Sequence, residues 1–192
     1  IYAAGAVQPG DEDDYFQSSL FTIARRRILW LLILVLANGL TTKVIAMNDQ
    51  ILKEIVLLAA FIPLLIGTGG NVGAQSSTVV IRGLSTQKLK TLGAVKAVVK
   101  EAITGALLGI LMILVVFPFA WWQGEGPLIA YAVGISLISI TTLAATVGAI
   151  LPLLFDRMRL DPALMSSPFI TTVTDIAGVF IYLNTAKWLL GN

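Results

Sequence analysis

The chain has 192 residues, of which 57% are hydrophobic and only 12% are charged, and its mean hydropathy is +0.88. Soluble domains carry about 25% charged residues, so this composition is typical of a protein that has lipid as its solvent. The sequence contains no His and no Cys, which excludes disulfides, haem ligation, thiol nucleophiles and the usual zinc sites, and its formal net charge of +2 is too small for electrostatic binding of nucleic acid.

Residues 1–27 are expected to form an N-terminal linker and a short amphipathic or connecting segment, and residues 28–192 a transmembrane domain. The N-terminal part contains an acidic cluster of Asp11, Glu12, Asp13 and Asp14. This cluster is either a solvated terminus or a contact for a divalent cation, because carboxylate oxygens are the ligands that hard cations prefer.

Five apolar stretches are long enough to cross a membrane, which takes about 20 mostly apolar residues in a helix. With uncertain edges, they are residues 28–47, 55–81, 102–120, 128–155 and 163–190. The sequence therefore predicts an all-α, polytopic membrane protein with five transmembrane helices.

Basic residues fall mostly on one side of these spans. Ten precede the first span or lie in the connections after the second and fourth spans, against three on the other side. The ten are Arg25, Arg26, Arg27, Arg82, Lys88, Lys90, Lys96, Lys100, Arg157 and Arg159. Because short cytoplasmic loops are enriched in Lys and Arg, we expect a cytoplasmic N-terminus and an external C-terminus in the inner or plasma membrane.

The second span carries the segment "GTGGNVGAQSST", which combines four glycines with Asn71 and Gln75. One interpretation is a seam in which small residues let two helices pack closely. The other is a distorted segment along a water-filled path, where freed carbonyls, Asn71 or Gln75 meet an ion or its hydration shell. Both interpretations remain open at this point.

Asp175 lies near the middle of the last span, where an ionised side chain costs about 2.5–3.5 kcal/mol. Helical spacing predicts a polar stripe of Pro168, Thr171, Thr172, Asp175, Gly178 and Tyr182, and a lipid-facing stripe of Phe169, Ile170, Val173, Ile176 and Phe180. The carboxyl group is either protonated and hydrogen-bonded to a threonine, paired with a basic residue, or part of a cation or proton site. The ion pair is disfavoured because no Lys or Arg lies at a matching depth.

Asp161 precedes Pro162 at the expected start of the last span, which is the signature of a helix N-cap. Capping is compatible with a second role at the inner mouth of an ion path, because one carboxylate oxygen can cap the helix while the other faces an ion.

The polar groups inside the spans are all oxygens or amides, and hard cations such as Mg²⁺ take such ligands while keeping several waters. One aspartate per chain is a sparse site for a divalent ion. Two chains around a twofold axis supply two carboxylates, and such dimers are the commonest closed assembly. This chemistry leaves a proton or sodium site open.

Three segments carry a resemblance to a known family: "PLLIGTGGNVGAQSSTVVIRGLS" (63–85), "KEAITGALLG" (100–109) and "LPLLFDRMRLDPALMSSPFITTVTDIAGVFIYL" (151–183). With them the chain resembles the membrane domain of the MgtE family of magnesium channels and transporters. The resemblance implies a homodimer with an ion path at the subunit interface, in which Asp175 holds hydrated Mg²⁺ and Asp161 lies near the cytoplasmic mouth. The implied pore-lining residues are Ser167, Thr171, Thr172, Gly178, Gly69, Gly70, Asn71 and Gln75.

Two features depart from the family pattern that the resemblance implies. Ser167 stands where members carry Asn, and members carry cytoplasmic regulatory domains before the first span, where this sequence has about 27 residues. The sequence is therefore either a piece of a longer chain or a homologue without those domains.

The expected function is channel-like conduction of largely hydrated Mg²⁺, with Mg²⁺, membrane lipid and a second copy of the chain as partners. The alternatives are a proton- or sodium-coupled divalent cation exchanger and a non-transporting membrane scaffold. We do not expect an enzyme, because no Ser, Lys, His or Cys constellation offers a base beside a nucleophile.

Overall fold

A computed structural model describes residues 19–191, except for residues 88, 90–92, 124–126 and 161. Every element in this part of the chain is a helix, which confirms the predicted all-α class. The helices are α2 (Leu20–Ala46), α3 (Asp49–Glu54), α4 (Val56–Ser85), α6 (Ala94–Trp122), α7 (Pro127–Arg157) and α8 (Pro162–Leu190).

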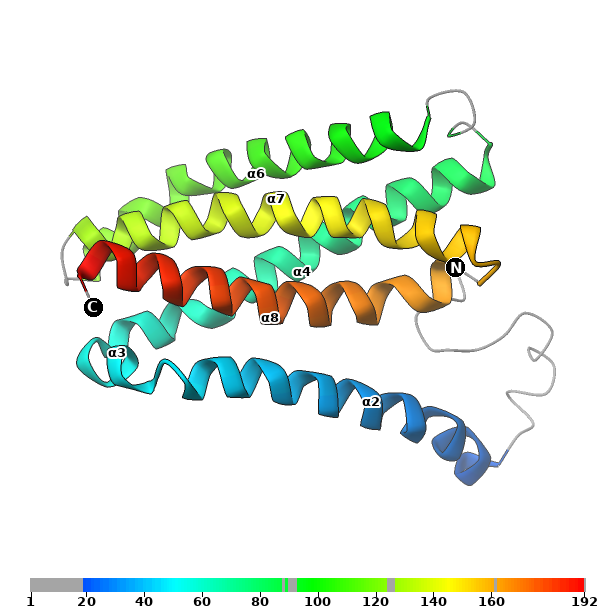
Figure 1. Ribbon diagram of the computed structural model, residues 1–192, viewed down its shortest axis with the longest axis horizontal. Coiled ribbons are helices and arrows are strands. Elements are labelled where there is room, and N and C mark those ends of the chain that lie inside the picture. Colours follow the sequence, from blue (N-terminus) through cyan, green and yellow to red (C-terminus); the bar gives the residue numbers. More distant parts are fainter. Residues whose placement is uncertain (1–18, 88, 90–92, 124–126, 161, 192) are drawn as a thin grey trace.

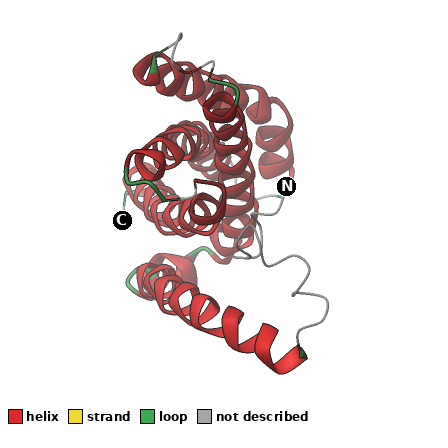
Figure 2. Ribbon diagram, turned by 90° about the vertical axis from the view of Figure 1, so that its right-hand side faces the viewer, coloured by secondary structure: helices red, strands yellow, loops and turns green. Residues whose placement is uncertain are grey.

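Helix α7 lies at the centre of the bundle and packs against α4, α6 and α8, whereas α2 packs against α8 (Figure 1). The helices α6, α7 and α8 run along the long axis, and α4 crosses them diagonally. Seen from the end, α2 stands apart from the other long helices (Figure 2). The small residues of α7 allow this close packing, since Ala130, Ala132, Ala144 and Ala149 are fully buried.

Four helical segments are long and apolar enough to cross a membrane: Val56–Ser85, Ala94–Trp122, Pro127–Arg157 and Pro168–Leu190. They agree with four of the five predicted spans. The apolar part of α2, Leu31–Ala46, is shorter, so the first span stays a prediction. The expected boundary between residues 27 and 28 falls inside α2, which begins at Leu20 and is continuous across it.

Most threonine hydroxyl groups of the bundle for which a hydrogen bond is found donate to a carbonyl of their own helix. Thr68 Oγ1 donates to the Leu64 carbonyl at 2.7 Å, and Thr174 Oγ1 donates to the Ile170 carbonyl at 2.8 Å. A membrane offers no water to buried polar groups, so internal bonds of this kind let threonines occupy apolar helices. The same principle explains why these helices tolerate internal prolines.

The glycine-rich segment of the second span is not distorted: α4 is one continuous helix through it. The structure thus shows no break in this helix, and two of its glycines, Gly69 and Gly73, lie in close contact with neighbouring helices. A Cβ atom built on Gly148 of α7 would overlap the carbonyl oxygen of Gly73 of α4. A Cβ atom on Gly105 of α6 would lie 2.5 Å from the Thr141 carbonyl oxygen of α7.

We expect Gly148→Ala to destabilise the protein by about 1–3 kcal/mol, the usual range for overpacking, because α4 and α7 must separate to admit the methyl group. Thermal unfolding in detergent measures the effect. Gly39→Ala is the matched control, since no heavy atom lies within 4 Å of a Cβ atom there. Alanine also favours a helix over glycine by up to about 1 kcal/mol, so this control should melt no lower than the parent. Equal melting of both variants would contradict the close contact of α4 with α7.

The basic residues gather at one end of the bundle, where α2, α6 and α8 begin and α4 and α7 end (Figure 1). Those that the structure describes there are Arg25, Arg26, Arg27, Arg82, Lys96, Lys100, Arg157 and Arg159, while Lys88 and Lys90 lie outside the described residues. At the other end of the bundle, the exposed side chains of Trp121, Trp122 and Trp188 lie near the ends of α6 and α8. Tryptophans are enriched at membrane–water interfaces, so these three mark the opposite membrane surface.

Candidate ion-binding site

Asp175 lies on α8 with a partly exposed side chain. Within the part of the chain that the structure describes, no ion pair or hydrogen bond reaches its carboxylate. One ion pair joins Lys53 to Asp49, near the end of the bundle away from the basic residues. The alternative that Asp175 pairs with a basic residue therefore has no support within one protomer.

The glycines of α4 bring that helix against α8 beside Asp175. A Cβ atom on Gly69 would lie 3.8 Å from Thr174 Cβ, and one on Gly70 would lie 3.7 Å from Thr171 Cγ2. Further along, a Cβ atom on Gly73 would meet Ile170 Cγ2 at 2.5 Å. Since the contacts run in opposite directions along the two helices, α4 and α8 are antiparallel here, and Asp175 follows directly after the Thr174 contact.

The polar residues of the two helices lie at the protomer surface next to this contact. Asn71 and Gln75 of α4 are exposed, Thr171 of α8 is exposed, and Thr172 is partly exposed. The Thr171 hydroxyl donates to the Pro168 carbonyl at 3.0 Å. One protomer therefore presents a strip of amides and hydroxyls beside a carboxylate, on a surface that α7 does not cover.

Sequence reasoning did not single out Gly67, which is also exposed on α4 and has no heavy atom within 4 Å of a built Cβ atom. It precedes Asn71 and Gln75 at intervals of four residues, which places the three on one side of the helix. That spacing was the signal available in the sequence.

Part of the predicted polar stripe on α8 faces the interior instead. Tyr182 is fully buried. Gly178 is also buried, and a Cβ atom built on it would lie 3.7 Å from the Ile140 side chain of α7. The predicted lipid-facing stripe was wrong at Ile170, which is also fully buried, against Gly73. Phe180 is exposed, as that stripe predicts.

Two expected site residues cannot be located. Asp161 lies outside the described residues, and so does the side chain of Ser167 in α8. Among the described residues, no group of three or more His, Cys, Asp or Glu side chains could hold a metal ion. A divalent ion at Asp175 therefore needs further ligands from water, from the backbone or from another chain.

The family model for MgtE, described as a divalent cation transporter, matches residues 62–185. Proteins named Magnesium transporter MgtE are similar to the chain: that of Thermus thermophilus is 37% identical over 99% of the chain and 42% of its own length. The Bacillus subtilis protein is 32% identical over 91% of the chain and 39% of its own length. The Enterococcus faecalis protein is 33% identical over 87% and 37%. The chain thus spans about two-fifths of the length of these relatives.

Proposed function

Because the chain belongs to the MgtE family of divalent cation transporters, we propose that it carries Mg²⁺ across the membrane along a path between two copies of the chain. The observation that carries this proposal is the carboxylate of Asp175, which is partly exposed on a membrane-spanning helix and has no ion-pair partner among the described residues. An ionisable group in such a position is costly unless it faces a partner, a cavity or an ion.

The path has two sides in each protomer. Asp175 and Thr171 belong to α8, and the exposed side of α4 with Gly70, Asn71 and Gln75 lies beside them. The small residues of α4 leave room for the water shell that Mg²⁺ gives up reluctantly. A second copy, related by a twofold axis, doubles the number of carboxylates around the ion.

The protein is a multi-pass membrane protein, and its family consists of transporters rather than enzymes. We infer that α2 adds a fifth span and that the N-terminus is cytoplasmic. This orientation is supported by the basic residues gathered at one end of the bundle, because Lys and Arg are enriched in cytoplasmic loops.

The direct test is Mg²⁺ uptake into liposomes that contain the protein, driven by a membrane voltage in sodium-free buffers of equal pH on both sides, with a pH indicator in the lumen to report proton movement. A voltage of 100 mV contributes about 2.3 kcal/mol per elementary charge, hence about 4.6 kcal/mol for Mg²⁺. We expect uptake to persist and to increase with the voltage, as for a channel.

The two rival functions give different results in the same experiment. A proton-coupled exchanger would move protons out of the lumen as Mg²⁺ enters, and a sodium-coupled exchanger would give no uptake in the absence of sodium. A non-transporting scaffold would give uptake no greater than that of empty liposomes. Either result would overturn the proposed channel.

A further inference from the structure

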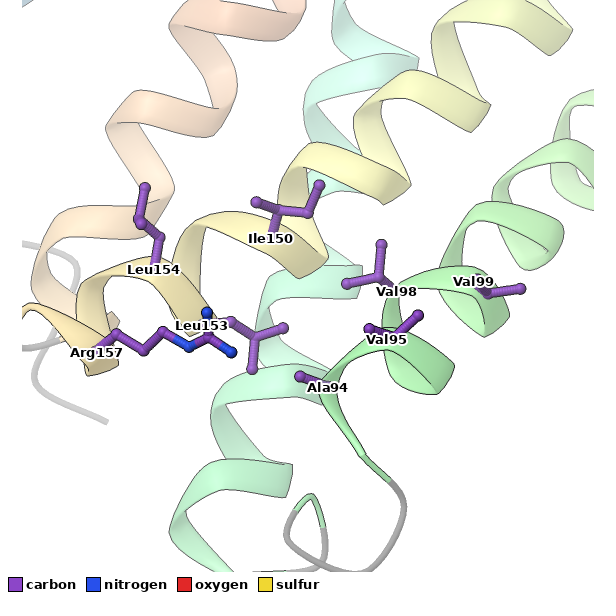
Figure 3. A pocket seen from close by; sticks show the side chains of 8 residues that line it. All are labelled: Ala94, Val95, Val98, Val99, Ile150, Leu153, Leu154 and Arg157. Atoms are coloured by element: carbon purple, nitrogen blue, oxygen red, sulfur yellow. The ribbon is translucent and has the colours of Figure 1, made fainter.

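A groove lies between the start of α6 and the end of α7, at the basic end of the bundle (Figure 3). It is a cavity of about 300 Å³. The described residues that line the groove belong to α6 and α7, so it is separate from the surface of α4 and α8 with Asp175.

The groove has an apolar floor and a basic rim. Val98 of α6 and Ile150 and Leu153 of α7 line the larger apolar part. Arg157 borders the first cavity, and its side chain extends from α7 toward the start of α6 (Figure 3). Lys96 and Lys100 line a separate hollow, on the side of α6 that faces away from α7.

The described residues that line the groove include no Asp or Glu. Two carboxylates lie close in sequence to the basic residues. Glu101 lines a different cavity, between α4 and α6, which Lys100 also borders, and Asp156 is exposed in the last turn of α7. The groove itself is therefore complementary to a negative charge joined to an apolar body.

We propose that this groove binds an anionic phospholipid of the surrounding membrane. An acyl chain lies along the apolar floor, and the phosphate lies at Arg157. Basic pockets between transmembrane helices on the cytoplasmic side are the kind of site that binds anionic lipid headgroups. The proposal concerns lipid binding alone and does not depend on the path that Mg²⁺ takes.

The surface around the groove favours lipid over a soluble anion or a protein. Helix α6 exposes apolar side chains beyond the groove, with Ile103 56% and Leu107 55% exposed, as expected where a helix faces lipid. A soluble anion would use the basic rim and leave the apolar floor uncovered. One phospholipid molecule places its acyl chain on the apolar floor and its phosphate at the basic rim.

The test compares thermal unfolding of the purified protein in detergent after addition of phosphatidylglycerol, phosphatidylcholine or inorganic phosphate. We expect phosphatidylglycerol to raise the melting temperature more than phosphatidylcholine does, and inorganic phosphate to leave it unchanged. In Arg157→Gln, phosphatidylglycerol should bind about fivefold more weakly, and the two lipids should become equivalent.

Arg159→Gln is the matched control, because this exposed arginine lies two residues from Arg157 and is not among the residues that line the groove. It should keep the full preference for phosphatidylglycerol. Val98→Trp, which fills the apolar floor but keeps every charge, should lose that preference, and native mass spectrometry should find less retained phosphatidylglycerol.

Three results would overturn the proposal: equal effects of both lipids on the parent protein, an equal loss of preference in Arg159→Gln, or stabilisation by inorganic phosphate alone. For each variant, the melting temperature with each lipid is compared with that of the same variant without lipid. A variant with a lower melting temperature therefore still reports its lipid preference. Because no readout involves transport, failure here leaves the proposed function untouched.

Discussion

Asp175→Asn should abolish most Mg²⁺ transport while the protein still folds. Asparagine has nearly the same shape as aspartate but carries no charge, so it removes the attraction that holds the cation in the apolar layer. Burying the charge costs about 2.5–3.5 kcal/mol, which the bound ion must offset. Loss of a contribution of that size corresponds to roughly a hundredfold decrease in uptake. Mg²⁺ flux into liposomes, normalised to the amount of inserted protein, measures this decrease.

Asp156→Asn is the matched control, because Asp156 is an exposed carboxylate in the last turn of α7. It removes the same charge from the chain and should leave uptake within a few-fold of the parent. Thermal unfolding should give similar melting temperatures for both variants. Full uptake by Asp175→Asn, or an equal loss in Asp156→Asn, would exclude Asp175 as the residue that holds the ion.

Asn71→Trp should block transport almost completely. Asn71 is exposed in the protomer and lies on α4 beside Gly70, which contacts α8 at Thr171. An indole ring fits there without disturbing the protomer, but it fills the space that a hydrated ion needs between two copies. The measurement is again Mg²⁺ flux, together with the melting temperature of the purified variant.

Ala59→Trp provides the comparison on the same helix. Ala59 is also exposed but lies 12 residues earlier, about 120° away around the helix axis. We expect this variant to transport normally and to melt close to the parent. If Asn71→Trp also transports normally, then this side of α4 faces lipid and the location of the path is wrong.

Most of the fold could be predicted from the sequence because lipid imposes a simple rule. Spanning segments must be long, apolar and helical, so their positions follow from hydropathy alone. The four spans that the structure supports agree closely with that prediction. The grouping of basic residues such as Arg82, Lys96 and Arg157 at one end also follows from their place in the connections.

The faces of the helices were harder to predict. In a soluble protein polarity separates the inside from the outside, but in a membrane both sides of a helix are apolar. The interior of α8 is therefore set by which neighbour packs on it, and Ile170 is buried because Gly73 of α4 makes space for it. For the same reason Gly178 and Tyr182 face the protomer interior, although they share a helical stripe with Asp175.

The role of the glycines in α4 was also difficult to predict from the sequence. Their number in α4 suggested either packing or distortion, and composition could not separate the two. The close approach of Gly73 to Gly148 shows that Gly73 serves helix packing. These two residues are far apart in the sequence, so their contact could not be predicted from composition. On the other side of α4, Gly67 is exposed and Gly70 contacts Thr171, which agrees with the proposed ion path along that side. Only the arrangement of α4 between α7 and α8 distinguishes these sides.

An experimental density map of the assembled protein, determined with Mg²⁺ and again after its removal, tests the central claim most directly. Our account predicts two copies of the chain with density on the axis between the two Asp175 carboxylates, at a separation that leaves room for water, and loss of that density without Mg²⁺. A map in which these side chains point into lipid, or meet in a dry contact whose density is the same under both conditions, would contradict it.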